Sequence, residues 1–470
     1  MSLCLMVGGA ASHVGKSWMT AAICRWLYRR GMRVAPFKAQ NMSNNSYPCR
    51  AGGEIGRAQV AQAEACGLEP EPDMNPILLK PTGDAASQVV VQGKVWRDLG
   101  ARAYYERFDE LLAKAAQSFE RLRSRFDVVV LEGAGSIAEL NLRRTDLVNL
   151  GFAGRYDIPV LLVADIDRGG VFAAVHGTID LLEPSERRLV RSFAVNRFRG
   201  DPTLFEDGVR ILEEKTRKPC LGVFPYAQDI HLDEEDGVRL DDLPARRGAA
   251  GRVAILRFPR ISNLTDFRLL PGAAWVDRPV AEEFDVVILP GTKNTLGDLA
   301  WLRSRGLDAW VHARHAAGAT ILGVCGGYQM LGERVKDPHG VESDRGGADG
   351  LGLLPVRTTL AVEKVTQVVQ GVTNGGAAFG AYEIHMGQTS PTRPVESLCS
   401  ADGRPEGARA GNCLGTYLHG ALETPDVLRE WLGLTADAVA SKEESYDRLA
   451  DWFENAVDVG LFERLYLGRS

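Results

Sequence analysis

The stretch from Thr320 to Leu331 constrains the fold of this chain more than any other sequence feature. An apolar run rich in β-branched residues ends at Cys325, two glycines follow, and the apolar spacing then predicts an amphipathic helix from Tyr328 to Val335. Gly323, Cys325 and Gly327 have the G-x-C-x-G spacing of a nucleophile elbow, where small neighbours leave room for an exposed side chain on a tight turn. The pattern predicts a strand, a sharp turn and a helix that present Cys325 as a nucleophile; a buried structural cysteine is the alternative.

A nucleophilic cysteine needs a base and an oxyanion hole, and two other segments supply candidates for them. Residues 284–290 predict a second buried strand that ends in a proline-glycine turn at Gly291, where backbone N–H groups would lie beside the elbow. Downstream, a strand-like run that begins at Gly415 ends at His419.

These three segments resemble the triad-type, or class I, glutamine amidotransferase domain. The resemblance implies that Cys325 attacks the side-chain amide of glutamine and that His419 transfers the protons. It also implies that the backbone N–H groups of Gly291 and Gly326 form the oxyanion hole. The third residue of that family is a Glu two positions after the histidine, and here this position is Ala421. We therefore expect another group, such as a backbone carbonyl, to orient the imidazole.

The N-terminal sequence predicts a phosphate-binding loop. An apolar strand from Leu3 to Val7 leads into a glycine-rich loop, and a helix follows through Tyr28. Gly9 lies five residues before Gly15, one more than in the standard pattern, and this longer loop resembles the dethiobiotin synthetase branch of the P-loop fold. Loop N–H groups would bind phosphate, the lysine would reach the β and γ oxygens, and the serine would ligate Mg²⁺. The predicted phosphate-binding residues are Gly9, Ser12, Gly15, Lys16 and Ser17.

Polar residues follow the next predicted strand, Arg33 to Phe37. The run from Lys38 to Ser46 would lie at the carboxyl edge of a parallel sheet, where doubly wound folds bind ligands, although a solvated loop is the alternative. We take Lys38, Gln40 and Asn41 as candidates for substrate or phosphate binding.

Acidic and amide side chains end three further predicted strands. Glu132 follows the apolar run Phe126 to Leu131 and could hold Mg²⁺, as a Walker-B acid does. Asn196 follows the strand Val190 to Val195 and is a candidate for reading the nucleotide base. Asp165, Asp167 and Arg168 follow the strand Pro159 to Ala164 and could bind metal and phosphate, or form a structural salt bridge. Glu54 could cap the helix that follows it or act as another metal ligand.

Longer blocks extend the resemblance over nearly the entire chain. Together they resemble the cobyric acid synthase family, and they comprise residues 38–46, 52–59, 75–81, 87–89, 131–136 and 163–172. The resemblance implies two α/β domains. An ATP-binding, dethiobiotin synthetase-like P-loop domain with a doubly wound parallel sheet would span residues 1–225, and residues 226–250, rich in charge and glycine, would be a linker. A class I glutamine amidotransferase domain with C-terminal helices would span residues 251–470.

The implied reaction is a glutamine-dependent amidation driven by ATP and Mg²⁺. The substrate would be adenosylcobyrinic acid a,c-diamide, whose b, d, e and g carboxylates become amides through acyl phosphates and ammonia released at Cys325. Such a polyanion needs local positive charge, for which Arg57, Lys80 and Arg168 are candidates. His385 lies in a block that resembles a family motif near the glutamine site, although a core histidine is the alternative.

Two other functions remain open at the sequence level. Cobyrinic acid a,c-diamide synthase shares the same two-domain plan. A partition-type P-loop regulatory ATPase with a relic amidotransferase domain is the alternative from a different class, but such proteins usually carry an extra lysine early in the loop, whereas this loop begins at Gly8 without one.

Composition limits the remaining possibilities. A formal net charge of −6 argues against a general nucleic-acid binder, and no apolar run approaches the length of a membrane span. The 8 cysteines include no C-x-x-C pair, which favours reduced thiols over disulfides or zinc. We expect a cytoplasmic enzyme, and the sequence does not indicate an oligomeric state.

Overall fold

The computed structural model describes residues 2–81, 86–227, 230, 252–343, 346–436 and 440–468. The chain folds into two compact units, and both are discontinuous in sequence. The first unit contains the described residues up to Ser43, from Gly53 to Ile230 and from Ala440 onward; the second contains Asn44–Gly52 and the described residues from Arg252 to Ala436. Most of the predicted linker, residues 226–250, lies outside the described residues.

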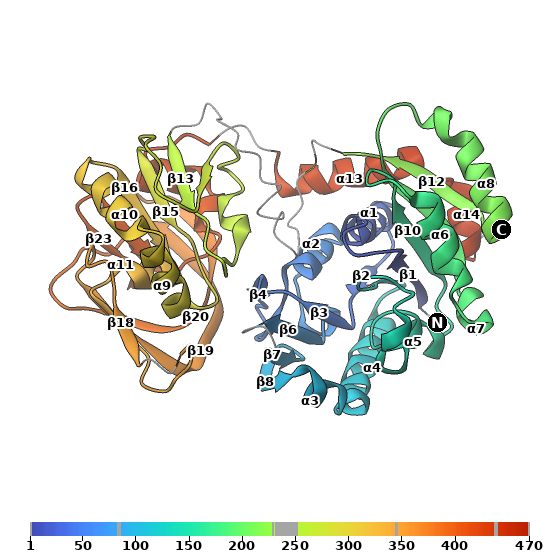
Figure 1. The fold of residues 1–470 in the computed structure, drawn as a ribbon, viewed down its shortest axis with the longest axis horizontal. Coiled ribbons are helices and arrows are strands. Elements are labelled where there is room, and N and C mark those ends of the chain that lie inside the picture. The colour runs from blue at the N-terminus through green and yellow to red at the C-terminus, as the bar shows by residue number, and fades with distance from the viewer. Residues whose placement is uncertain are drawn as a thin grey trace. The chain divides into compact units, whose positions relative to one another are not determined.

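The first unit is built on a parallel sheet of six strands in the order β12-β11-β10-β1-β9-β2 (Figure 1). The strands are short apolar runs, and most of their residues are buried, because helices cover both faces of such a sheet. Their bounds are β1 Leu3–Gly9, β2 Val34–Phe37, β9 Val128–Glu132, β10 Val160–Asp165, β11 Val190–Phe198 and β12 Cys220–Pro225. All the carboxyl ends meet at one edge, which confirms the predicted doubly wound parallel sheet.

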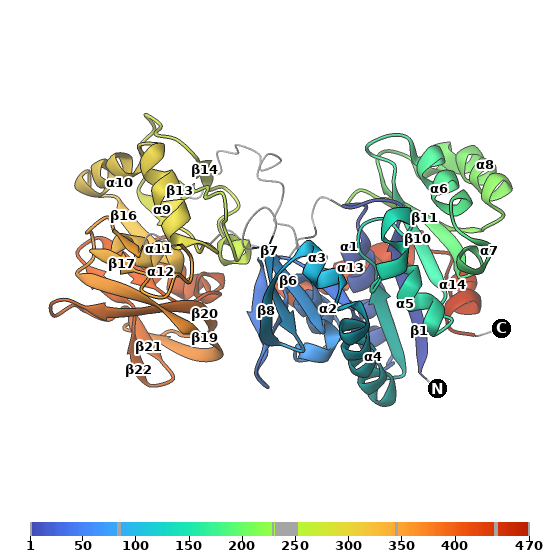
Figure 2. The same cartoon turned by 60° about the horizontal axis from the view of Figure 1, so that its bottom comes forward.

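Helices and a small second sheet surround this core. Figure 2 shows β6, β7 and β8 of the small sheet, whose order is β3-β6-β7-β8. Its strands are β3 Gln40–Met42, β6 Ile77–Pro81, β7 Ala86–Val91 and β8 Lys94–Gly100, and β5 is Glu54–Gly56. The helices are α1 Lys16–Arg29, α2 Arg57–Ala65, α3 Ala101–Tyr105, α4 Phe108–Arg125, α5 Leu150–Arg155, α6 Val171–Asp180, α7 Pro184–Arg187 and α8 Glu206–Thr216.

The C-terminal helices pack on the first unit, not on the amidotransferase domain to which the sequence analysis assigned them. The helices are α13, Lys442–Ala456, and α14, Val459–Tyr466. The ring centroid of Trp26, on α1, lies 5.6 Å from that of Phe453 and 5.4 Å from that of Phe462. The C-terminal helices therefore complete the core of the first unit. Figure 1 shows α13, in red, beside α1.

The second unit combines two sheets. The first has the order β14-β13-β15-β16-β24-β23 and is parallel except at β23. Its strands are β13 Val253–Leu256, β14 Ala274–Val276, β15 Val286–Leu289, β16 Thr320–Val324, β23 Ala408–Ala410 and β24 Cys413–Thr416. The second sheet contains the long antiparallel pair β19, Val356–Thr373, and β20, Ala378–Pro391. Its other strands are β17 Arg334–Lys336, β18 Gly347–Asp349, β21 Cys399–Ala401 and β22 Arg404–Glu406.

The helices of the second unit differ from the sequence prediction at one place. The helices are α9 Thr295–Ser304, α10 Leu307–Ala316, α11 Gly326–Leu331 and α12 Pro425–Leu432. The helix predicted from Tyr328 to Val335 is wrong in its second half, because α11 ends before Gly332, whose backbone is extended with ψ 179°. Val335 lies on β17 and packs against Leu296 and Leu360.

Asn44–Gly52 belongs to the second unit although the residues on both sides of it belong to the first. This segment contains the short strand β4, Ser46–Pro48. Asn45 Oδ1 accepts a hydrogen bond of 2.8 Å from the backbone N–H of Asn263, and the ring of Tyr47 lies 4.8 Å from that of Tyr382. The polar run predicted as one ligand-binding stretch, 38–46, is therefore divided between the units. No helix among the described residues is both long and apolar enough to cross a bilayer.

Candidate functional sites

The backbone around Cys325 has the strained geometry of a nucleophile elbow. Cys325 lies between β16 and α11 with φ 52° and ψ −108°, a conformation that non-glycine residues rarely adopt. A Cβ atom on Gly323 would lie 2.6 Å from the backbone nitrogen of Tyr328, and one on Gly327 would lie 1.9 Å from the carbonyl oxygen of Leu289. Both glycines are therefore required by close backbone packing, which explains the G-x-C-x-G spacing.

The turn after β15 packs against this elbow. A Cβ atom on Gly326 would lie 3.2 Å from the backbone nitrogen of Thr292, and one on Gly291 would lie 2.9 Å from Cε1 of His419. The structure thus brings together the four residues predicted for the glutaminase centre, Cys325, His419, Gly291 and Gly326.

Asp266 holds the imidazole of His419. Its Oδ2 lies 2.7 Å from His419 Nδ1, and its Oδ1 accepts a 2.7 Å hydrogen bond from the backbone N–H of Gly420. The Asp266 and His419 side chains are buried, with exposures of 2% and 0%. The Asp266 carboxylate therefore orients the imidazole in place of the Glu that the amidotransferase family carries at the position of Ala421. The expectation of a backbone carbonyl is wrong, and no local sequence pattern had singled out Asp266.

The charge on His419 follows from these contacts. Burial by itself lowers the pKa of His419, but the carboxylate of Asp266 and the sulfur of Cys325 reverse this effect and raise it to about 10. Because Nδ1 faces Asp266, Nε2 is the nitrogen available to Cys325. The ring of Tyr382 stacks on the imidazole at a centroid distance of 5.3 Å, which covers one face of the ring.

His385 has a different environment from that of His419. Its Nδ1 lies 2.8 Å from the carbonyl oxygen of Gly387, and its ring stacks on Tyr417 at 3.8 Å. Burial lowers the pKa of His385 to about 4, so it is neutral at physiological pH.

A further residue missed by the sequence analysis is Gln329, on α11, whose Oε1 accepts a 2.8 Å hydrogen bond from Thr295 and whose Nε2 donates to Tyr417.

The predicted phosphate loop folds around its own lysine. Gly15, with φ 93°, precedes α1, and Lys16 Nζ donates to the carbonyl oxygens of Ala11 at 3.0 Å and Gly135 at 2.9 Å. A Cβ atom on Gly9 would lie 2.9 Å from this nitrogen, so a glycine leaves room for the lysine. Ser12 is exposed on the same loop.

Ser17 and Glu132 meet as the sequence predicts. Ser17 Oγ donates to Glu132 Oε1 at 2.8 Å, and Lys38 Nζ lies 3.0 Å from the same oxygen. Burial by itself raises the pKa of Glu132, but Lys38, Gln62 and Ser17 outweigh this effect and lower it, so the carboxylate is ionised. A hydroxyl and an ionised carboxylate are hard oxygen donors that fit Mg²⁺, which takes one or two carboxylates and completes its shell with phosphate and water. Lys38 neutralises Glu132 and does not serve as an exposed substrate contact.

Several other predicted site residues form buried pairs. Glu54 accepts a 2.8 Å hydrogen bond from Lys80, and both side chains are at most 4% exposed. Arg57 is buried, with 2% exposure, on α2. Neither Lys80 nor Arg57 offers an accessible charge to a polyanion.

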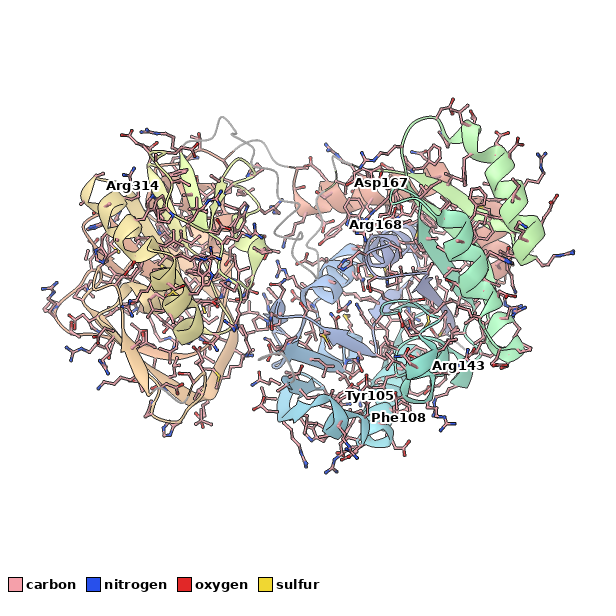
Figure 3. The ribbon with its side chains drawn as sticks, viewed as in Figure 1. Tyr105, Phe108, Arg143, Asp167, Arg168 and Arg314 are labelled. Carbon is pink, nitrogen blue, oxygen red and sulfur yellow. The ribbon has the colours of Figure 1, made fainter. Side chains whose placement is uncertain are left out.

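The polar side chains at the ends of β10 and β11 mainly bind one another and the predicted phosphate loop. Asn196 Nδ2 donates to the carbonyl oxygen of Val14 at 2.8 Å, so this side chain supports the phosphate loop. Asp165 pairs with Arg197 at 3.0 Å and lies 3.8 Å from Arg168, whose side chain is 55% exposed. Asp167 pairs with Arg199, which lowers the pKa of Asp167. Figure 3 shows Asp167 and Arg168. This arrangement favours the salt-bridge interpretation that the sequence left open.

Two further candidates for substrate contact also bind within the protein. Asn41 Nδ2 donates to Gln59 at 2.8 Å, and Gln40 Oε1 accepts a 2.5 Å hydrogen bond from Tyr104. Gln40 also lines a cavity beside the phosphate loop, whereas the side chain of Asn41 is buried.

A phosphate loop in one unit and an elbow-type thiol centre in the other define the class of ATP-dependent glutamine amidotransferases. Two family models match: the CobQ/CobB/MinD/ParA nucleotide binding domain over residues 5–240 and the CobB/CobQ-like glutamine amidotransferase domain over residues 252–427. The chain is 46% identical to a cobyric acid synthase of Mycolicibacterium gilvum over 97% of its length and 95% of that protein's length. It is 45% identical to a cobyric acid synthase of Syntrophobacter fumaroxidans over 98% of both chains. The chain belongs to the cobyric acid synthase family.

A solved glutamine amidotransferase structure is also similar, at 20% identity. It matches 39% of this chain and 98% of that protein with a TM-score of 0.31, a value too low to add to the assignment.

Proposed function

We propose that this chain amidates the b, d, e and g carboxylates of adenosylcobyrinic acid a,c-diamide, using ATP and glutamine, to give adenosylcobyric acid. The observation that carries the proposal is similarity along nearly the full length to relatives named cobyric acid synthase, combined with both reaction centres in one chain. Its 8 cysteines are free thiols, which suits a reducing compartment, and we propose the cytoplasm as the location.

Ammonia would form in the second unit. Cys325 Sγ attacks the side-chain carbonyl carbon of glutamine, and the oxyanion accepts hydrogen bonds from the backbone N–H groups of Gly291 and Gly326. His419, an imidazolium at neutral pH, delivers the proton on Nε2 to the departing nitrogen, while Asp266 fixes the ring and stabilises its charge. Water then hydrolyses the thioester, releasing glutamate and restoring the thiol.

Amidation would take place in the first unit. A carboxylate is a poor acyl donor because its oxygen leaves badly, so a carboxylate oxygen attacks the γ-phosphorus of ATP and forms an acyl phosphate and ADP. Lys16 stabilises the transferring phosphoryl group, and Mg²⁺ when bound neutralises phosphate charge. Ser17 and Glu132 are the residues that would hold the ion. Ammonia then attacks the acyl carbon and phosphate leaves.

The test follows corrinoid mass in the presence of ATP, Mg²⁺ and either glutamine or ammonium. Wild-type protein is expected to convert four acids to amides with both nitrogen sources, and Cys325→Ala is expected to work only with ammonium. Lys16→Ala serves as the complementary variant, since it is expected to lose amidation with both sources while still releasing glutamate from glutamine.

Other outcomes would overturn the proposal. If wild-type protein released glutamate but left the mass of the a,c-diamide unchanged, the substrate would be wrong. Conversion of cobyrinic acid only as far as the a,c-diamide would assign the alternative diamide synthase activity.

A further inference from the structure

A cavity beside the phosphate loop has no role in the chemistry described above. Its volume is 270 Å³, and its walls come from Gln40, Tyr105 and the chain between Ala134 and Leu150, with Glu186 at one side. The cavity therefore lies entirely within the first unit.

The cavity shares a wall with the phosphate loop. Gly135 lines the cavity, and its carbonyl oxygen accepts the 2.9 Å hydrogen bond from Lys16. The next wall residue but one, Ile137, donates its backbone N–H to Gly9 at 2.9 Å. Gly135 thus connects the wall of the cavity to the lysine of the predicted phosphate loop.

The walls are held rigidly by side chains that bind backbone groups. Asn149 exchanges two hydrogen bonds with Ala134, at 3.0 and 2.7 Å. Asp146 accepts backbone N–H groups from Val148, Asn149 and Gly151 at 2.8–3.0 Å. A wall with this support is a preformed site.

The rim of the cavity is apolar and exposed. Tyr105 on α3 is 41% exposed, and Leu140 and Leu142, on the short 3-10 helix Leu140–Thr145, are 45% and 39% exposed. Figure 3 shows Tyr105 together with Arg143, which follows Leu142 in the chain. Clustered exposed apolar side chains next to a cavity are typical of a ligand-binding surface.

Size and charge restrict what can enter. The volume equals that of about nine water molecules, which admits one side-chain arm of a corrinoid but not the macrocycle. The charged wall residues are Arg143, which pairs with Glu183 and Glu186, and the acids Glu139, Asp146 and Glu186. An excess of acids repels a carboxylate arm, whereas a carboxamide arm is neutral and donates hydrogen bonds through its NH₂ group.

We infer that this cavity holds an already amidated arm of the corrinoid, with the apolar edge of the macrocycle resting on Tyr105, Leu140 and Leu142. The arm anchors the substrate while a carboxylate on another arm reaches the phosphate loop. The cavity then selects a corrinoid that already carries amides. Each newly formed amide gives the corrinoid one more arm that can enter the cavity. This inference rests on the proposed function.

The first test measures the KM for adenosylcobyrinic acid a,c-diamide with saturating ATP and ammonium, which bypasses the second unit. The double substitution Tyr105→Ala, Leu142→Ser is expected to raise this KM by about tenfold, because it removes apolar contact area, and to leave the KM for ATP unchanged. The matched control is Leu204→Ser, since Leu204 is 84% exposed in the same unit and does not line the cavity. An unchanged corrinoid KM in the double variant would overturn the inference.

The second test measures binding by equilibrium dialysis without ATP. Wild-type protein is expected to bind the a,c-diamide at least about tenfold more tightly than cobyrinic acid, which carries only carboxylates, and Glu139→Lys is expected to narrow this difference. Equal affinity of wild-type protein for the two corrinoids would contradict the selection for an amide arm. If wild-type protein did not amidate the corrinoid at all, the proposed function itself would be wrong. If wild-type protein amidated the corrinoid but the variants bound it as wild-type protein does, only the role of the cavity would be wrong.

Discussion

Asp266 and His419 are 153 positions apart in sequence, yet His419 Nδ1 lies 2.7 Å from Asp266 Oδ2. The same carboxylate binds the backbone N–H of Gly420, so it fixes both the ring and the turn that carries it. A carboxylate in this position holds the proton on Nδ1 and stabilises the imidazolium. Asp266 is therefore a positioning residue for His419.

Replacing Asp266 tests this role. Asp266→Asn is expected to lower kcat for glutamine hydrolysis by about 100-fold or more, because an amide can hold the ring in the wrong tautomer and does not stabilise its charge. Amidation driven by ammonium is expected to remain, measured as corrinoid mass. Asp285→Asn is the control, because Asp285 forms an exposed pair with Arg252. Normal glutamine hydrolysis in Asp266→Asn would disprove the assignment.

The same variant has a predicted effect on pH dependence. The pKa of His419 is raised to about 10, so the imidazolium persists to alkaline pH and its charge is lost only as pH rises through that value. Without the Asp266 carboxylate, burial lowers the pKa, and the alkaline limb of glutamine hydrolysis is expected to move to lower pH. The measurement is kcat/KM for glutamine against pH in both proteins. An alkaline limb at the same pH in both would show that Asp266 does not control the charge on His419.

Local sequence pattern predicted one part of the centre and could not predict the other. Cys325, Gly291 and Gly326 lie in strand-turn patterns that specify their own geometry, and these residues do meet. Asp266 has no local pattern, because its role exists only once β13 and β24 lie in one sheet. Lys80 was misread for a related reason: residue type shows that a charge is present but not that Glu54 neutralises it in the interior.

At the scale of elements, the helical end of the chain shows how far periodicity extends. The expected C-terminal helices are present as α13 and α14, because apolar spacing determines which face of a helix is apolar. Spacing does not determine which surface that face covers. The partner is α1, whose Trp26 packs against Phe453 and Phe462, and ion pairs from Arg25 to Glu443 and Asp447 line the same contact.

Truncating this contact is expected to destabilise the first unit. Phe453 is fully buried, so Phe453→Ala should reduce the free energy of unfolding by about 3–5 kcal/mol, through lost apolar contact and the cavity left behind. Urea denaturation followed by tryptophan fluorescence measures this change. Phe172→Ala is the control, since Phe172 is 40% exposed on α6. Equal stability of the two variants would mean that the C-terminal helices contribute little to this unit.

At the scale of the whole molecule, the two units exchange segments of chain. The composition break near residue 226 predicted a boundary between consecutive domains, but the described residues of the first unit resume at Ala440, and the second unit includes Asn44–Gly52. Such exchange leaves no compositional trace, because each segment has the ordinary sequence of a strand or a helix. Family resemblance specified the two folds correctly and could not specify which segments each fold would incorporate.

The Asn44–Gly52 segment gives the second unit a predicted dependence on the N-terminal part of the chain. Tyr47 packs on Tyr382, which stacks on His419, so Tyr47→Ala is expected to lower glutamine hydrolysis by about tenfold, whereas Tyr47→Phe retains the ring and should retain most of the rate. Glutamate release measures the effect. Equal loss in the two variants would assign the effect to the hydroxyl group and not to ring packing.

The position of Tyr47 also limits how a gene of this kind can be rearranged. Recombination within residues 226–250 would join an N-terminal part from one gene to a C-terminal part from another. Tyr47, which supports His419 through Tyr382, would then come from a different gene than Cys325. The helices that complete the core of the first unit would likewise come from a different gene than the rest of that core. The N-terminal and C-terminal parts of the chain therefore cannot be exchanged independently between related genes. If the two units were encoded by separate genes, the second unit would lack Asn44–Gly52 and the first would lack the C-terminal helices, and both segments would have to be replaced.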